Sequence, residues 1–155
     1  MTSEISIQQH DFSLADEVAL LEQDNATDGA VVTFTGRVRN NNNETEVSTL
    51  TLEHYPGMTE KSLAKIITTA KERWNIGRVK VIHRIGALQV GEQIVFVGVS
   101  ASHRAEAFQA CDFIMDYLKS RAAFWKKETQ GEQSQWVSAK EGDALSLARW
   151  SDSQV

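Results

Sequence analysis

Residues 78–101 read RVKVIHRIGALQVGEQIVFVGVSA and contain the pattern that decides the fold. Apolar and β-branched side chains dominate this stretch, and QVGE (89–92) interrupts them, which predicts two strands joined by a turn. The second strand, IVFVGVS (94–100), is apolar at nearly every position rather than at alternate positions. A strand of that kind is covered on both faces, so we expect it at the centre of a sheet.

Two further strands are expected upstream of this stretch. GAVVTFTGRV is rich in β-branched residues and predicts a strand over 30–38, and VSTLTLEHY (47–55) alternates partly and predicts its antiparallel return strand. The polar run RNNNNETEVS (39–48) between them is typical of a loop. It could serve function or be a surface insert, and composition leaves both open. Pro56 and Gly57 close the return strand.

Two segments have the spacing of amphipathic helices. In the first, the apolar positions are Leu63, Ile66, Ile67, Ala70 and Trp74. In the second, the predicted apolar stripe consists of Phe108, Cys111, Met115 and Leu118. We expect Asn75 and Gly77 to end the first helix and Ser102 to cap the start of the second.

The last part of the chain predicts a hairpin, because FWKKE (124–128) and QWVSA (135–139) flank the turn-forming TQGEQS. From Asp143 the tail is expected to form a short helix ending at Trp150. The resulting order, β-β-α-β-β-α-β-β, predicts an α+β fold: a mostly antiparallel sheet with packed helices and a small β-hairpin subdomain. We expect residues 1–155 to form a single domain.

Composition excludes several classes of function. The formal net charge is -5, which argues against general nucleic-acid binding, so any cationic cluster would suit a small anion. No apolar run is long enough to span a membrane, and the N-terminus lacks the pattern of a signal peptide. Cys111 is the only cysteine, so no intramolecular disulfide can form, and the predicted compartment is the cytoplasm.

The histidines and the cysteine do not predict a catalytic centre. His10, His54, His83 and His103 lack the spacing of zinc ligands, and we expect no metal. His54 and His83 fall within predicted strands and are interpreted as hydrogen-bonded structural residues. Cys111 lies on an apolar stripe and is interpreted as a buried, inert thiol. No glycine-rich phosphate loop occurs, and we expect no cofactor.

Cations gather where predicted elements end. Arg37 and Arg39 flank Val38 at a strand end, and His103 with Arg104 opens a helix, where free backbone N–H groups favour an anion. Lys119 and Arg121 close that helix, and Lys126 with Lys127 begins the next strand. Each pair alone could be solvated charge. Together the pairs favour an anion pocket.

Six motifs then resemble one family. They are GAVVTFTGRVRN, LTLEHYPGMTEKSLA, VIHRIGALQVGE, FVGVSASHRAEAF, IMDYLKSRAAFWKKE and WVSAKEGD, in this order over about 28–150. Together they resemble the catalytic (large) subunit of molybdopterin synthase. The resemblance implies an α/β hammerhead-like fold and an enzyme that converts cyclic pyranopterin monophosphate to molybdopterin. The two dithiolene sulfurs would come from the thiocarboxylated C-terminus of a small ubiquitin-like sulfur-carrier subunit.

The resemblance also implies the site and its partners. The catalytic residues would be Lys119 and Lys126. The substrate-binding residues would be Arg37, Val38, Arg39, His103, Arg104, Lys119, Lys126, Lys127 and Glu128. Lys127 and Lys140 depart from the arginine found in many relatives, which retains charge but loses bidentate geometry. The family forms a heterotetramer, a large-subunit dimer with one carrier at each end. The alternatives are a non-catalytic small-anion-binding regulatory module and an inactive interaction subunit.

Helix geometry adds a constraint of its own. Arg104 and Lys119 are 15 residues apart in one predicted helix, so about 22 Å separates their backbones. A single pterin cannot touch both within one chain. If both bind the substrate, a second chain must supply one of them, as a two-fold dimer would do twice.

Overall fold

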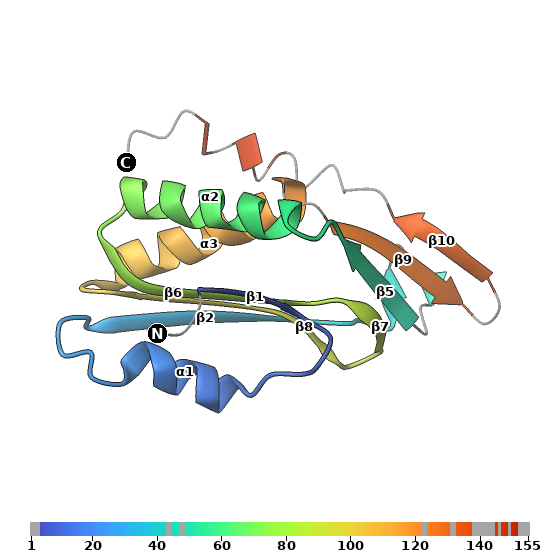
Figure 1. Cartoon of the computed structure of the whole chain (residues 1–155), viewed down its shortest axis with the longest axis horizontal. Coiled ribbons are helices and arrows are strands. Elements are labelled where there is room, and N and C mark those ends of the chain that lie inside the picture. The colour runs from blue at the N-terminus through green and yellow to red at the C-terminus, as the bar shows by residue number, and fades with distance from the viewer. Residues whose placement is uncertain are drawn as a thin grey trace.

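A four-stranded sheet, the main sheet, forms the centre of the molecule (Figure 1). Its strands in spatial order are β1 (Ile5–Gln8), β6 (Ile76–Arg84), β8 (Gln93–Ala101) and β2 (Ala30–Arg37). Only the β1–β6 pair is parallel. This computed structural model describes residues 4–42, 45–46, 49–121, 124–130, 133–137, 145, 147–148 and 150–151. Within these, the backbone alone is described at 41–42, 45–46, 121, 125–128, 130, 133–135 and 137.

A second four-stranded sheet, the small sheet, adjoins one end of the main sheet (Figure 1). Its strands in spatial order are β10 (Gln133–Val137), β9 (Phe124–Gln130), β5 (Thr49–His54) and β7 (Gly86–Gln89). The chain passes from β6 into β7 at Gly86, whose φ of 88° favours glycine. The short strands β3 (Asn41–Asn42) and β4 (Thr45–Glu46) pair with each other.

The helices cover both faces of the main sheet. Helices α2 (Met58–Arg73) and α3 (Arg104–Arg121) lie on one face, and α1 (Leu14–Glu22) lies on the other (Figure 1). The larger core contains Val95, Val97 and Val99 of β8 together with apolar residues of α2 and α3. On the opposite face, Phe96 of β8 packs with Leu21, Phe12 and Ile82. None of the described helices is both long and apolar enough to cross a membrane.

The main predictions of fold are confirmed. The fold is α+β with mostly antiparallel sheets, β8 is central, and 124–128 forms a hairpin with 135–137 in β9 and β10. The predicted turn at 89–92 joins β7 to β8. The expected C-terminal helix falls mostly outside the described residues, although positions 145, 147 and 148 are helical. Trp150 packs edge-on against Trp74 and Phe113.

The predicted partner of the strand at 47–55 is wrong. This segment was expected to return along 30–38, but β2 pairs with β8, and β5 pairs with β7 and β9. Leu50 and Leu52 of β5 are buried with Leu88 and Val38 in a separate small core, which the small sheet provides. The run 39–48 was expected to be only a loop, whereas its described part forms β3 and β4.

Four local predictions also need correction. Gly77 lies within β6 instead of ending α2, whose C-cap is Trp74. Helix α3 begins at Arg104, and the Ala107 N–H donates to the carbonyl of His103, so Ser102 lies one position too early to be the cap. Phe108 is 61% exposed, whereas Ala107 and Ala110 beside it in α3 are fully buried, so the buried face of the helix passes through these alanines and leaves Phe108 outside it. β1 and α1 have no counterpart in the predicted order.

We expect Gly98→Ala to lower the free energy of unfolding by about 1–3 kcal/mol. A Cβ at Gly98 would lie 2.5 Å from Leu21 Cδ1 and 2.8 Å from the Phe96 ring, so one of these buried side chains, or α1 with Leu21, must shift to make room for it. Denaturant unfolding measures the change. In the double variant Gly98→Ala/Leu21→Ala, the added methyl partly fills the space left by leucine, so the two losses should be less than additive. Additive losses would contradict close packing of α1 on β8.

Candidate functional site

The cations at the end of β2 lie beside the turn between β7 and β8. Arg37 is the last residue of β2 and is opposite Gln93, with a register shift between Gly36 and Arg37. Arg37 and Arg39 are exposed, whereas the side chain of Val38 between them is buried. The end of β2 thus presents two guanidinium groups to solvent, on either side of the buried Val38.

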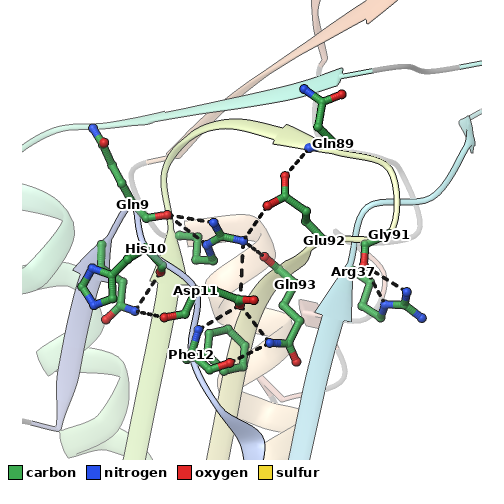
Figure 2. A network of polar contacts seen from close by, with 11 residues as sticks. Gln9, His10, Asp11, Phe12, Arg37, Gln89, Gly91, Glu92 and Gln93 are labelled. Atoms are coloured by element: carbon green, nitrogen blue, oxygen red, sulfur yellow. Dashed lines mark hydrogen bonds and ion pairs between the residues drawn. The ribbon is translucent and has the colours of Figure 1, made fainter.

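The turn holds Arg37 in a defined orientation. Arg37 Nε and Nη2 donate to the carbonyl oxygen of Gly91 at 3.1 and 2.9 Å (Figure 2). The Val38 N–H donates to Glu92 O, and the Gly91 N–H donates to Val38 O, both at 2.9 Å. Two of the five guanidinium N–H groups therefore bind the turn, and three can serve an anion.

The lysines predicted to be catalytic lie where α3 leads into the small sheet. Lys119 is exposed in the last turn of α3, and β9 begins a few residues later at Phe124. In β9, Lys126, Lys127 and Glu128 are opposite Leu52, Thr51 and Leu50 of β5. Alternate positions of a strand share a face, so the backbone register puts positions 126 and 128 on the same face of the small sheet and position 127 on the opposite face.

Two histidines hold the strands of this junction. The buried ring of His83 in β6 stacks on Phe124 with 3.8 Å between centroids, and its Nδ1 lies 2.8 Å from Arg84 O. His54 is opposite Phe124 in the β5–β9 register, and its Nε2 lies 3.7 Å from Glu60 Oε1. The interpretation as a hydrogen-bonded structural residue is confirmed for His83, whereas for His54 it stays a prediction. Within the described residues, no group of three or more His, Cys, Asp or Glu side chains could hold a metal ion.

His103 and Arg104 lie at the other end of the main sheet. They follow Ala101 of β8, which is opposite Ala30 at the start of β2, and both are exposed. From there the 18-residue helix α3 runs back to the end that carries Lys119. One chain therefore brings Arg37, Arg39, Lys119 and the start of β9 to a common end, but not His103 or Arg104.

Cys111 takes no part in this arrangement. Its side chain is buried in the core, and Sγ lies 3.9 Å from Val97 O. Burial, and next the charge of Asp112, raises the pKa of the thiol to about 12. A thiol that stays protonated is a poor nucleophile, so the prediction of an inert cysteine is confirmed.

A buried arginine close to this end of the main sheet was not predicted from the sequence. Arg84, at the end of β6, is buried, and its guanidinium contacts the N-terminal segment and the start of β8. Its signal was the interruption of an apolar strand by a charge in VIHRIG (81–86), followed by an acidic residue, Glu92, in the turn.

The chain matches one protein family, and the similar proteins of known name share the same name. The family model described as MoaE protein matches residues 7–121. The molybdopterin synthase catalytic subunit of Escherichia coli is 58% identical over 90% of this chain and 92% of its own length. That of Yersinia pestis is 56% identical over 90% of this chain and 91% of its own length.

Solved structures of similar proteins share the fold. The molybdopterin biosynthesis MoaE protein of Burkholderia ambifaria has a TM-score of 0.82 and 48% identity, and the match covers 96% of this chain and 98% of that one. Molybdopterin synthase of Staphylococcus aureus has a TM-score of 0.81 and 30% identity, with 89% and 99% covered. The complex of subunits 1 and 2 of the Helicobacter pylori molybdopterin-converting factor has a TM-score of 0.72 over 90% and 92%; at 19% identity it supports the fold alone.

We expect the Cys111 thiol to resist an aromatic disulfide reagent at pH 8 in the native protein and to react once denaturant unfolds it. Because its pKa is about 12 in the folded chain and near 9.0 ordinarily, only the unfolded thiol ionises in between. The contribution of the protonated Cys111 thiol to the free energy of unfolding is therefore complete below pH 9 and is lost as the pH rises towards 12. Cys111→Ala should show a shallower loss of stability over that range. Rapid labelling of native protein at pH 8 would contradict the assignment.

Proposed function

Because the chain belongs to the MoaE family, the catalytic subunits of molybdopterin synthase, we propose that its clustered cations form the site of sulfur transfer to a pterin phosphate. The chain is an enzyme of molybdenum cofactor biosynthesis. Its substrate is cyclic pyranopterin monophosphate, and its sulfur donor is the thiocarboxylated C-terminus of a small carrier subunit. We place the reaction in the cytoplasm.

The convergence of Arg37, Arg39, Lys119 and the start of β9 at one end of the main sheet carries this proposal. A phosphorylated pterin and a thiocarboxylate are both anions, and the chain itself has a net charge of -5. Bringing the two together requires a local cluster of cations that offsets their repulsion. Such a cluster also stabilises negative charge that develops during the reaction.

The chemistry requires a proton donor and acceptor beside the anion site. The thiocarboxylate sulfur displaces an oxygen substituent from a side-chain carbon of the pterin and forms an S-acyl intermediate. Water then cleaves the acyl–sulfur bond, which leaves sulfur on the pterin and a carboxylate on the carrier. Two such rounds give the dithiolene. Lys119 serves as the acid–base group, and Lys126 stabilises the anionic intermediate.

The remaining candidates surround these two lysines as substrate contacts. Arg37 and Arg39 approach from the end of β2, and Lys127 and Glu128 follow Lys126 in β9. The backbone N–H and carbonyl of Val38 bind the turn, so we assign Val38 to shaping the pocket wall. Glu128 shares a sheet face with Lys126 and orients it.

His103 and Arg104 complete the site from a second copy of the chain. Their distance from Lys119 along α3 requires this if all of them bind one pterin. β2 is an edge strand of the main sheet, and Phe34 on β2 and Phe108 on α3 are 39% and 61% exposed. An edge strand with exposed aromatic neighbours favours a covering partner. We propose a two-fold dimer with one carrier at each end, a heterotetramer.

Lys119→Ala should lower the single-turnover rate of dithiolene formation on the order of 10²- to 10⁴-fold, the range that general acid–base groups contribute. Because Lys119 is exposed, the variant should unfold at the wild-type denaturant concentration. Lys65→Ala on the exposed face of α2 removes an equal charge and should keep wild-type activity. Mass spectrometry of the pterin measures the product. A folded Lys119→Ala enzyme with near wild-type turnover would remove Lys119 from the mechanism.

Subunit mixing tests the shared site. Arg104→Ala and Lys119→Ala homodimers should each be inactive, and random exchange of their chains makes about half the dimers mixed. Each mixed dimer has one intact composite site and one doubly damaged site, so about a quarter of wild-type activity should return. Native mass spectrometry confirms the exchange. Complete exchange without recovered activity would mean that each site belongs to one chain.

A further inference from the structure

Arg84 connects three segments beneath the turn between β7 and β8. Its Nε and Nη2 donate to Gln9 O at 3.1 and 2.9 Å, and its Nη1 donates to Gln93 O at 2.9 Å (Figure 2). Its side chain is only 7% exposed. A buried guanidinium requires carboxylate partners as well as carbonyls, and Glu92 and Asp11 provide them, with Nη1–oxygen distances of 3.5 and 3.8 Å.

Glu92 connects the buried Arg84 guanidinium to the turn. One carboxylate oxygen, Oε1, faces Arg84, and the other, Oε2, accepts the backbone N–H of Gln89 at 2.6 Å (Figure 2). The backbone of Glu92 closes the same turn, since its N–H donates to Gln89 O at 3.0 Å. Its carbonyl accepts the N–H of Val38 at 2.9 Å. One residue therefore joins the buried arginine, both ends of the turn and the end of β2.

The turn presents a carbonyl to Arg37. Gly91 has a φ of 90°, a conformation that glycine adopts without strain, and its carbonyl oxygen accepts both the Nε and the Nη2 hydrogens of Arg37. A paired contact of this kind fixes the plane of the guanidinium, so that its remaining N–H groups point in one direction. If the turn moves, the guanidinium loses that orientation.

We propose that Glu92 is a positioning residue for substrate binding, acting through the carbonyl of Gly91 on the guanidinium of Arg37. The ligand class is a phosphate ester anion, since a planar guanidinium with fixed N–H groups suits phosphate oxygens. This inference rests on the proposed function, because it takes Arg37 as a contact of the pterin's phosphate. Glu92 itself touches no substrate.

Asp11 provides the matched control. It is the second carboxylate beside Arg84, and it also accepts hydrogen bonds from Gln93 Nε2 at 2.9 Å and the Phe12 N–H at 2.8 Å. Those hydrogen bonds, with that from Gln93 the stronger influence, lower its pKa. Asp11 lies on the N-terminal segment, and its described partners are Gln93, Phe12 and Arg84, so Asp11→Asn removes a carboxylate beside Arg84 without removing a hydrogen bond within the turn 89–92.

The experiment is steady-state kinetics of the variants with cyclic pyranopterin monophosphate and saturating thiocarboxylated carrier. Glu92→Ala should raise KM for the pterin about tenfold, with kcat within about twofold of wild type, because binding rather than chemistry is impaired. Glu92→Gln retains one oxygen for the Gln89 N–H and should restore part of the affinity. Asp11→Asn should leave KM unchanged. In Arg37→Ala/Glu92→Ala, KM should equal that of Arg37→Ala alone, since the two residues act in series.

Three results would overturn the inference. They are a wild-type KM in folded Glu92→Ala or Glu92→Gln, KM effects that multiply in the double variant, and a wild-type KM in Arg37→Ala. If Glu92→Ala does not fold, Glu92→Gln with the Arg37 cycle provides the same readout. Failure of the proposed function has another signature: Lys119→Ala would keep its rate of dithiolene formation whatever happens to KM in the Glu92 variants.

Discussion

Strand β8 is covered on both faces, by α2 and α3 on one side and by α1 on the other, and it lies between β6 and β2. Val95, Val97 and Val99 face the larger core, whereas Phe96 and the bare backbone of Gly98 face α1. This double burial fixes the register of every neighbouring strand, since a shift of one residue would exchange the two faces. The positions of the cations follow from it.

Because α3 follows β8 directly and packs back along the main sheet, it carries cations to both ends of that sheet. His103 and Arg104 remain where β8 ends, and Lys119 reaches the end where β8 begins, beside the small sheet. Lys119 is thus separated from two of the proposed binding residues, His103 and Arg104, by the length of α3. If all of them bind one pterin, as proposed, the catalytic site requires a dimer.

The features predicted correctly are those that depend on a short stretch of sequence. The unbroken apolar run of β8 indicated burial on both faces, and the cations at the ends of β2 and α3 were identified from their places in the sequence. Strand pairing was predicted less well. The alternation in β5 indicates a half-buried strand but does not indicate which strands pair with it. Phe108 was misplaced because the buried face of α3 is formed at its start by the small residues Ala107 and Ala110, which the spacing of large apolar residues does not reveal. Arg84 was missed because a buried guanidinium depends on carbonyls from Gln9 and Gln93, distant in sequence.

The most direct test of the central claim is a crystal structure of the Lys119→Ala variant with cyclic pyranopterin monophosphate bound. We expect phosphate oxygens to lie within hydrogen-bonding distance of Arg37 or Arg39 of one chain and of His103 or Arg104 of a second. We also expect the pterin to lie beside the truncated position 119. A pterin whose contacts all come from a single chain, or one bound away from the end of β2, would contradict the central claim.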